Sequence, residues 1–265
     1  MRLSRAFPKC SSSQLLSFLS VLSLSAFSSG CGAKTVVLTE PAPQLTYVET
    51  VLADAPMAYW RLNDLSGLVA KDSTANARDA AYHATTVLAQ PGPIHSDTAS
   101  LSILDTDNGS TSVLFANTFM TAGTNLTLEI WHKTTSDNIN ILFYVGNGAS
   151  RGFGFDYRVL STFSRLELLL GNLAFNALTF VDGSPGYSGL PDTWAYYVLT
   201  RDDTTWKLYI DGAGPVATGT QDPFPILGTD SIQIGQCKGS FAEAAIYDKA
   251  LTLEQVQAHY KAAGY

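Results

Sequence analysis

The segment spanning residues 194–212 places the strongest constraint on the fold of this chain. Its aromatic and β-branched residues alternate with a period of two in two runs, which the polar residues 201–204 separate. Such residues fit a pleated, half-buried surface, so the segment predicts a β-hairpin closed by an Asp-Asp turn. Asp211 and Gly212 supply the positive φ that the next reversal requires. Because a lone hairpin with so much aromatic surface is unstable, we expect it to pack on a second sheet.

Composition supports a β-rich fold with a sizeable core. Hydrophobic residues make up 46% of the 265 residues and charged residues 15%, which suits one large β domain or two small ones. The 21 glycines and 11 prolines recur along the chain, and no long helical pattern precedes residue 250. These features favour an all-β sandwich. The net charge of −7, without any cluster of Lys and Arg, argues against nucleic acid and anionic membrane as partners.

Alternating or apolar runs bounded by turn residues predict about a dozen strands, which describes a two-sheet antiparallel jelly roll. Residues 47–54 precede the first strand and form a short helix or a turn. Turns are expected at residues 90–93 and 105–109. Outside the hairpin, the predicted strands cover residues 56–64, 81–84, 112–115, 125–133, 139–145, 152–159, 165–170, 173–181, 231–235 and 240–247.

The chain is predicted to end in a short helix. Thr252 and Gln255 have the spacing of a capping box, with Thr252 as the N-cap. Leu253, Val256 and Tyr260 follow at i, i+3 and i+7, one stripe that can dock on the sandwich.

Residues 1–30 are typical of a secretory signal. Three basic residues precede an apolar segment at 15–27, which is too short and too polar for a comfortable membrane span. The small residues 28–30 before Cys31 resemble a bacterial lipoprotein processing site, although Ser28 stands where such sites usually carry Leu. Cys31 would then be lipidated, and the protein would be exported to the bacterial outer membrane or cell surface. The alternative is an ordinary cleaved signal and a secreted protein.

The remaining cysteines agree with export. Cys10 leaves with the signal, and Cys237 then has no disulfide partner. Residues 31–46 contain Pro41 and Pro43 and are expected to form an extended tether. Residues 47–265 would form the folded domain, which meets the membrane only through a lipid anchor at Cys31.

The order of several motifs resembles the laminin-G-like members of the concanavalin A-like lectin/glucanase superfamily. The resemblance runs from about residue 52 to residue 260, and the specificity lies in the order and spacing of the motifs. It implies two packed antiparallel sheets of jelly-roll form, in secreted or surface proteins that bind glycans or other proteins. The motifs are residues 58–62, Asp72-Ser73 with Asn76, residues 127–131, residues 193–194 with 206–212, and residues 243–251 with Glu254 and Tyr260.

The resemblance also implies a calcium ion at the edge of the sandwich. The matching positions in this chain are Asp64, Asp72, Asn76 and Glu243, and Ca²⁺ prefers such carboxylate and amide oxygens. Ala242 replaces an Asp that family members often carry there, so one carboxylate is missing. The alternative is that Asp72, Ser73 and Asn76 only cap a turn.

Catalysis is not expected. A retaining glycosidase needs two carboxyl groups about 5–5.5 Å apart, but Trp131 stands where a partner for Glu129 would be, and Glu167 has no acid two residues away. No electropositive site for Cys237 is visible. No pair of histidines has metal-ligand spacing, and each is expected to be a surface or partly satisfied residue: His83, His95, His132 and His259.

The predicted function is a non-catalytic cell-surface binding module with carbohydrate as its expected ligand. Sugar sites stack pyranose rings on aromatic faces, and Tyr144, Tyr157 and Tyr187 lie in or beside glycine-rich segments that could line such a site. The four tryptophans are expected in the core or on sheet faces. The alternative function is a protein-interaction or structural lipoprotein of the envelope.

Overall fold

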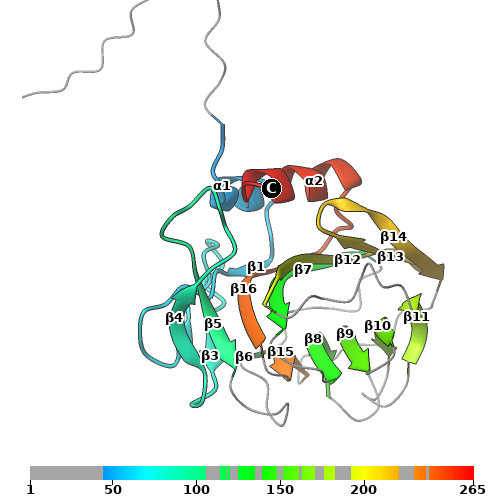
Figure 1. Cartoon of the computed structure of the whole chain (residues 1–265), viewed down its shortest axis with the longest axis horizontal. Coiled ribbons are helices and arrows are strands. Elements are labelled where there is room, and N and C mark those ends of the chain that lie inside the picture. The colour runs from blue at the N-terminus through cyan, green and yellow to red at the C-terminus, as the bar shows by residue number, and fades with distance from the viewer. Residues whose placement is uncertain are drawn as a thin grey trace, which may run out of the picture. The chain divides into compact units, whose positions relative to one another are not determined.

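The computed structural model describes residues 44–105, 114–117, 119, 125–134, 139–147, 152–160, 163–170, 176–182, 192–220, 230–236 and 239–265. It divides the chain into Met1–Gln44 and Leu45–Tyr265. Of the first unit only Gln44 lies within the described residues, so the fold described here is that of the second. In these ranges it begins with helix α1 (Tyr47–Ala53), continues with sixteen strands and ends with helix α2 (Leu253–Ala262) (Figure 1). Neither helix is long and apolar enough to cross a membrane.

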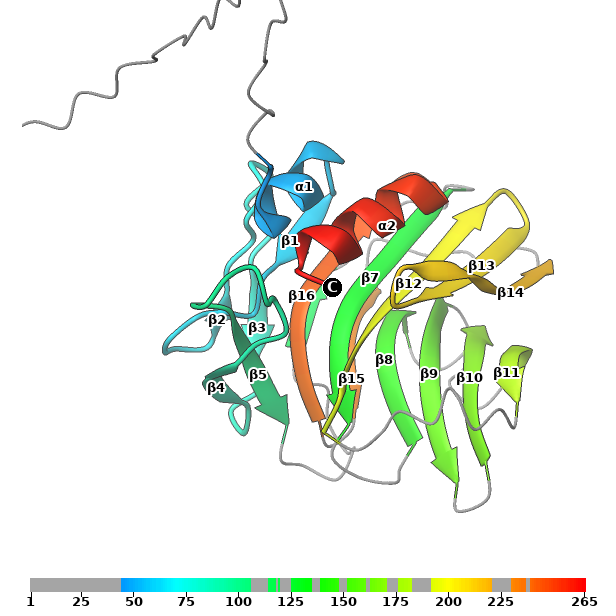
Figure 2. The ribbon, with the colours of Figure 1, turned by 45° about the horizontal axis from the view of Figure 1, so that its top comes forward.

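The strands form two eight-stranded antiparallel sheets that pack as a sandwich, as the predicted all-β jelly roll requires (Figure 2). The first sheet has the order β14-β13-β12-β7-β16-β5-β4, and β1 pairs with β16 beside this path. Its strands are β1 (Ala58–Trp60), β4 (Val87–Pro91), β5 (Leu101–Asp105), β7 (Leu126–Thr134), β12 (Trp194–Asp202), β13 (Thr205–Ile210), β14 (Ala213–Thr220) and β16 (Gly239–Tyr247).

The second sheet has the order β11-β10-β9-β8-β15-β6-β3-β2. Its strands are β2 (Val69–Ala70), β3 (Ala80–Tyr82), β6 (Leu114–Asn117), β8 (Ile139–Gly146), β9 (Gly152–Leu160), β10 (Phe163–Leu170), β11 (Asn176–Asp182) and β15 (Ser231–Gln236).

The predicted hairpin is confirmed as β12 and β13, and both of its faces are buried. Asp202 pairs with Thr205, so the turn is formed by Asp203 and Thr204, one residue beyond the predicted Asp-Asp turn. One face, with Tyr197 and Leu199, joins the core between the two sheets. The other face, with Tyr196 and Val198, joins a second apolar cluster that also contains Val51 of α1 and Val256 of α2. The first sheet therefore lies between two hydrophobic layers.

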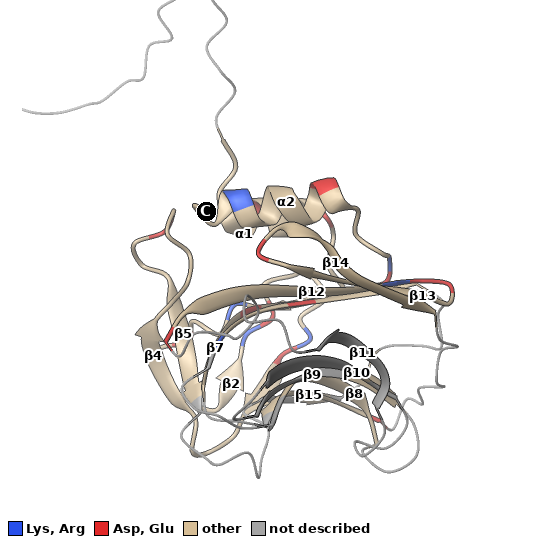
Figure 3. Cartoon of the chain, turned by 45° about the vertical axis from the view of Figure 1, so that its right-hand side comes forward, with Lys and Arg blue, Asp and Glu red and all other residues tan. Residues whose placement is uncertain are grey.

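The two helices cover the outer face of the first sheet (Figures 1 and 2). The segment predicted to form a short helix or a turn is a helix, α1, and its capping box joins Thr46 and Glu49. The predicted capping box of α2 between Thr252 and Gln255 is also present. Glu254 lies in the first turn of α2 and Lys261 in the last, which complements the helix dipole (Figure 3).

Four strands differ from the sequence prediction. Gln90 and Pro91, expected in a turn, belong to edge strand β4, where a proline is tolerated because no neighbouring strand needs its N–H. β2, β5 and β14 were not predicted. β14 consists of small residues, Val and Thr without alternation of apolar and polar positions, so periodicity gave no signal.

Candidate functional site

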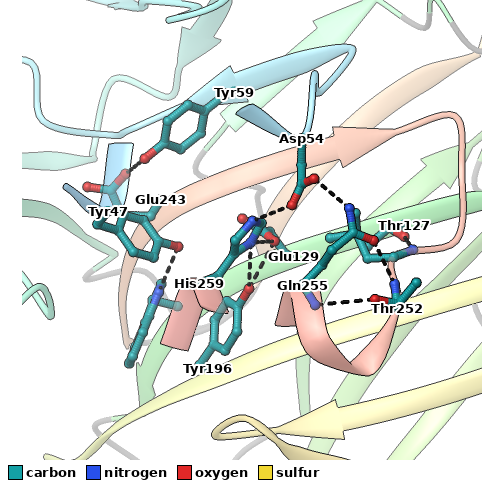
Figure 4. A network of polar contacts seen from close by, with 12 residues as sticks. Tyr47, Asp54, Tyr59, Thr127, Glu129, Tyr196, Glu243, Thr252, Gln255 and His259 are labelled. Atoms are coloured by element: carbon teal, nitrogen blue, oxygen red, sulfur yellow. Dashed lines mark hydrogen bonds and ion pairs between the residues drawn. The ribbon is translucent and has the colours of Figure 1, made fainter. Parts of the chain in front are cut away.

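A cluster of polar side chains lies buried between the first sheet and the two helices (Figure 4). We call Asp54, Glu129, Tyr196 and His259 the buried network. His259 Nδ1 lies 3.0 Å from Glu129 Oε2, and His259 Nε2 lies 3.0 Å from Asp54 Oδ2. The Tyr196 hydroxyl donates a hydrogen bond of 2.9 Å to the same Glu129 oxygen. These contacts join β7, β12, α2 and the C-cap of α1.

The charges of the buried network favour a protonated histidine. Both ring nitrogens of His259 face carboxylate oxygens, an arrangement in which only imidazolium donates twice. Burial opposes this charge, but Glu129 and Asp54 outweigh it and raise the pKa of His259. Burial, and then the Glu129 carboxylate, raise the pKa of Tyr196 well above its usual range. Tyr196 therefore keeps the proton that it donates to Glu129.

Two atoms beside this cluster are buried without a hydrogen-bond partner in the described part of the chain: Glu129 Oε1 and the Tyr247 hydroxyl oxygen. Burial and the Glu129 charge raise the pKa of Tyr247 well above its usual range, so this hydroxyl keeps its proton. An unpaired buried polar group costs about 1–3 kcal/mol. Glu129, Tyr196 and His259 have no exposed surface, so only Asp54 of the buried network reaches solvent.

Glu243 is the second buried carboxylate of this layer. It lies at positive φ (54°), where a register shift between Ala242 and Ala245 interrupts the pairing of β16 with β7. Its side chain accepts a hydrogen bond from the Tyr59 hydroxyl and pairs with Arg61 at 3.3 Å. Burial raises the pKa of Glu243 to about 7, although Arg61 and Tyr59 act in the opposite direction.

Asp72, predicted to bind calcium, uses both of its carboxylate oxygens within the protein. Oδ1 accepts hydrogen bonds from the backbone amides of Tyr59 (3.0 Å) and Thr74 (2.9 Å). Oδ2 accepts from the Thr74 hydroxyl (2.8 Å) and the Arg78 amide (2.8 Å). The bond to the amide two residues on is the contact of an Asx-turn, so Asp72 ties this turn to β1.

The other predicted calcium ligands also bond to protein groups. Asp64 Oδ2 accepts from the Tyr82 hydroxyl at 2.8 Å, and Asn76 Nδ2 donates to the Met57 carbonyl oxygen at 2.9 Å. Glu243 is held by Tyr59 and Arg61, as described above. In the described ranges no group of three or more His, Cys, Asp or Glu could hold a metal ion. These four residues therefore do not fit a calcium ion as a set, and calcium binding by this chain stays a prediction.

The predicted sugar-stacking tyrosines are not brought together in the described structure. Tyr144 is fully buried, which argues against it as a surface that stacks on a sugar. The side chain of Tyr157 and the whole of Tyr187 lie outside the described residues, as do Cys31 and Cys237.

Two of the histidines expected to be surface or partly satisfied are fully buried. One is His259, in the buried network. The other is His132, whose pKa burial lowers to about 3, so its ring is neutral.

An aromatic surface near the end of α2 was missed from the sequence. We call His95, Tyr260 and Tyr265 the C-terminal aromatic surface. Tyr265 is 39% exposed, His95 is exposed and Tyr260 is half-buried. The Tyr265 ring lies 4.2 Å from the His95 ring and 5.0 Å from the Tyr260 ring, between centroids. Trp131 lies beneath at 5.1 Å from Tyr265. The helical stripe pointed to Tyr260, but Tyr265 and His95 lie outside any periodic element and gave no signal.

Of the two acids considered for catalysis, Glu129 is closed off from solvent and the side chain of Glu167 lies outside the described residues; the other buried glutamate, Glu243, is closed off as well. Glu129 and Glu243 have no exposed surface, and each is bound by protein side chains. A substrate could reach neither carboxyl group in this arrangement.

Comparison with known proteins agrees with the fold. A laminin G-type family model, described as the concanavalin A-like lectin/glucanases superfamily, matches residues 107–257. A search of curated proteins found no match. Similar solved structures include the receptor-binding domain of botulinum neurotoxin D, with a TM-score of 0.56 and 15% identity over 79% of this chain and 53% of that domain.

Two other similar structures were solved with sialic acids. The serotype D ligand-binding domain in complex with N-acetylneuraminic acid has a TM-score of 0.54 and 14% identity, over 78% of this chain and 51% of that domain. The Trypanosoma rangeli sialidase in complex with 2,3-difluorosialic acid has a TM-score of 0.53 and 14% identity, over 78% of this chain and 33% of the enzyme. The chain thus spans about half the length of the toxin domains and a third of the sialidase. At such identities the likeness establishes the fold alone.

The family match extends over more than half of the 265 residues, and its two-sheet architecture is the one observed. The chain belongs to the concanavalin A-like lectin/glucanases superfamily.

Proposed function

We propose that this protein is a non-catalytic binding module of the cell surface whose ligand is carbohydrate. The observation that carries this proposal is the C-terminal aromatic surface. His95, Tyr260 and Tyr265 present partly open rings above a rigid aromatic core. Exposed rings beside polar groups are what pyranose recognition requires. The sialic acid complexes of similar folds lend support as analogy only.

The absence of catalysis is part of the proposal. Retaining glycosidases place two accessible carboxyl groups about 5–5.5 Å apart around the bond that they cleave. Here Glu129 is bound to Tyr196 and His259, and Glu243 to Arg61 and Tyr59, in fully buried positions. Their bonds to fixed partners suit structural roles.

The location is also a proposal. A signal at residues 1–30 and a lipidated Cys31 would hold the module at the bacterial surface by the tether at residues 31–46. An exposed module on a tether could reach glycans around the cell, and it would need no membrane contact other than the anchor.

A protein-binding role is the second candidate, and one observation favours it. Leu65 and Leu68 lie on the segment that leads into β2, and Val69 is the first residue of β2; their exposed fractions are 76%, 58% and 45%. Three exposed apolar side chains so close in sequence can form part of a protein-binding patch.

Glycan-array binding of the purified protein tests these two functions. We expect a defined subset of glycans to bind, and Tyr265→Ala to weaken that binding at least about tenfold, which corresponds to about 1.4 kcal/mol. Leu65→Ala is the matched control, because it removes an exposed apolar side chain elsewhere. The melting temperature of each variant checks that the fold is kept. Failure of every glycan to bind, or equal binding by Tyr265→Ala, would reject the aromatic surface and favour a protein partner.

A further inference from the structure

We propose that His259 is a proton-dependent latch that holds α1 against α2 and the first sheet. This device goes beyond the proposed glycan binding and does not rest on it. It joins Asp54 at the C-cap of α1, His259 on α2 and Glu129 on β7 (Figure 4).

The geometry makes this latch depend on a proton. His259 Nδ1 and Nε2 each lie 3.0 Å from a carboxylate oxygen. A neutral imidazole has one N–H and one lone pair, so it can donate to only one of the two carboxylates. After deprotonation, the ring nitrogen that lost its proton and the carboxylate oxygen that it faces would both present lone pairs. The hydrogen bond between these two atoms is therefore lost.

The bond to Asp54 is the one that breaks. The Glu129 side chain is fully buried, whereas the Asp54 side chain is 20% exposed. Water can therefore solvate Asp54 when its histidine partner is lost, but it cannot reach Glu129 in the same way. An uncompensated buried charge is costly, so the neutral ring keeps its N–H toward Glu129 and releases Asp54.

Release of Asp54 loosens α1. This helix has only seven residues, and a helix so short is unstable unless tertiary contacts hold it. Its other contacts to the layer include the buried Tyr47 and Val51, a hydrogen bond from Trp131 Nε1 to the Tyr47 hydroxyl, and one from Gln255 to Asp54. The latch is thus a substantial part of what docks α1, the first element after residues 1–44.

The groups that face His259 come from four elements. Glu129 lies on β7, Asp54 follows α1, Tyr196 lies on β12, and the Tyr247 ring of β16 lies 6.4 Å away between centroids. The pKa values of both tyrosines are raised well above 10, so they stay neutral. The pKa of His259 is raised from 6.5. The contribution of protonated His259 to the stability of the folded protein is therefore complete below pH 6.5. It is lost as pH rises through the higher pKa that His259 has in the folded protein.

Hydrogen exchange of the full chain, measured by mass spectrometry at pH 6 and pH 9, tests the latch. Protection factors, each taken against the intrinsic rate at its own pH, are compared for peptides from α1 and from the β12–β13 hairpin. We expect α1 protection to fall about tenfold or more at pH 9, because the loss of a hydrogen bond to a charged group lowers stability by about that factor. Both peptides are measured in the Glu243→Gln background, which removes the pH-dependent stability of Glu243, and there the hairpin should change far less. Equal changes in both peptides would overturn the proposal.

Two variants separate the latch from a general loss of stability. An amide at position 54 can either accept from His259 or donate to it, so Asp54→Asn should keep α1 docked and abolish the pH step. His95→Gln is the matched control, because it removes an exposed histidine that contacts the Tyr265 ring and not the latch. It should retain the step. A step that persists in Asp54→Asn, or that vanishes in His95→Gln, would also overturn the proposal.

Discussion

At the scale of single residues, Asp72 links a turn and a strand through one carboxylate. Its two oxygens accept four hydrogen bonds, three of them from backbone amides. We expect Asp72→Ala to lower the free energy of unfolding by about 2–3 kcal/mol, because it leaves these donors without their acceptor. Urea denaturation measures this change, and the exposed Asp248→Ala serves as the control.

The same experiment bears on calcium. If Asp72 caps a turn, the loss should be equal in millimolar calcium and in EDTA. A loss that appears only in calcium would show that Asp72 binds the ion and that the predicted metal site exists.

Glu243 should make the stability of the protein depend on pH. Its pKa is about 7 in the folded protein against 4.5 for the free side chain, with burial as the main cause. Between these values the folded state holds a proton that the unfolded chain releases. The contribution of protonated Glu243 to the free energy of unfolding is therefore complete below pH 4.5. As pH rises through about 7 this contribution is lost, and the loss is about 3 kcal/mol in total.

Glu243→Gln removes this titration. Urea denaturation at intervals from pH 4.5 to pH 8 gives the free energy of unfolding of each protein. The value for the wild type minus the value for the variant should fall as pH rises across that range. The comparison cancels the contribution of His259, which both proteins share. A constant difference would mean that Arg61 keeps Glu243 ionised throughout.

At the scale of elements, α2 depends on close contact with the turn between β13 and β14. A Cβ on Gly212 would lie 2.8 Å from Tyr260 Cδ1, and the residue has a φ of +67°. We expect Gly212→Ala to destabilise the protein by at least about 1 kcal/mol more than Gly67→Ala, because overpacking adds to backbone strain. Gly67 is the matched control, since its φ is +96° and a Cβ there would meet nothing within 4 Å.

Thermal or urea unfolding of both glycine variants measures the difference. Equal losses of stability in the two variants would mean that the Tyr260 ring moves away from the new methyl group without cost. Helix α2 would then pack more loosely on this turn than the contact indicates.

Elements with a local signal could be predicted from the sequence. The β12–β13 hairpin has alternation, a polar turn and Asp211 at positive φ. The α2 capping box follows from the spacing of Thr252 and Gln255. β4 and β14 lack such a signal, because they are edge strands whose side chains are mostly not buried, so their sequences need not alternate.

At the scale of the whole molecule, the buried network could not be predicted. Glu129 and His259 are 130 residues apart, and each looks ordinary in its own segment. They meet only because β7 lies in the middle of the first sheet and α2 crosses its outer face. The resemblance identified the fold, but it gave no sign that Asp72 and Glu243 bond to groups of the protein. Burial and pairing over long distances decide the roles of these side chains.

Truncation tests where the folded domain begins. Removal of residues 1–44 should leave the free energy of unfolding unchanged, because Leu45–Tyr265 forms a compact unit of its own, and the described residues of both apolar clusters that involve the first sheet lie within it. A protein that begins at Pro56 lacks α1 as well. It should be less stable by about 3–6 kcal/mol, because it loses the buried side chains of Tyr47 and Val51.

Urea denaturation followed by tryptophan fluorescence measures both truncations. The Trp131 indole packs edge-on against Tyr47 at 6.5 Å between ring centroids and donates a hydrogen bond to its hydroxyl. Loss of α1 should therefore shift the emission to longer wavelength, whereas Val51→Ala in the full chain should lower stability with a smaller shift. If the protein lacking residues 1–44 were itself several kcal/mol less stable, the tether would be part of the fold. If the protein that begins at Pro56 kept its full stability, α1 would contribute no docking energy, and the latch at His259 would have nothing to hold.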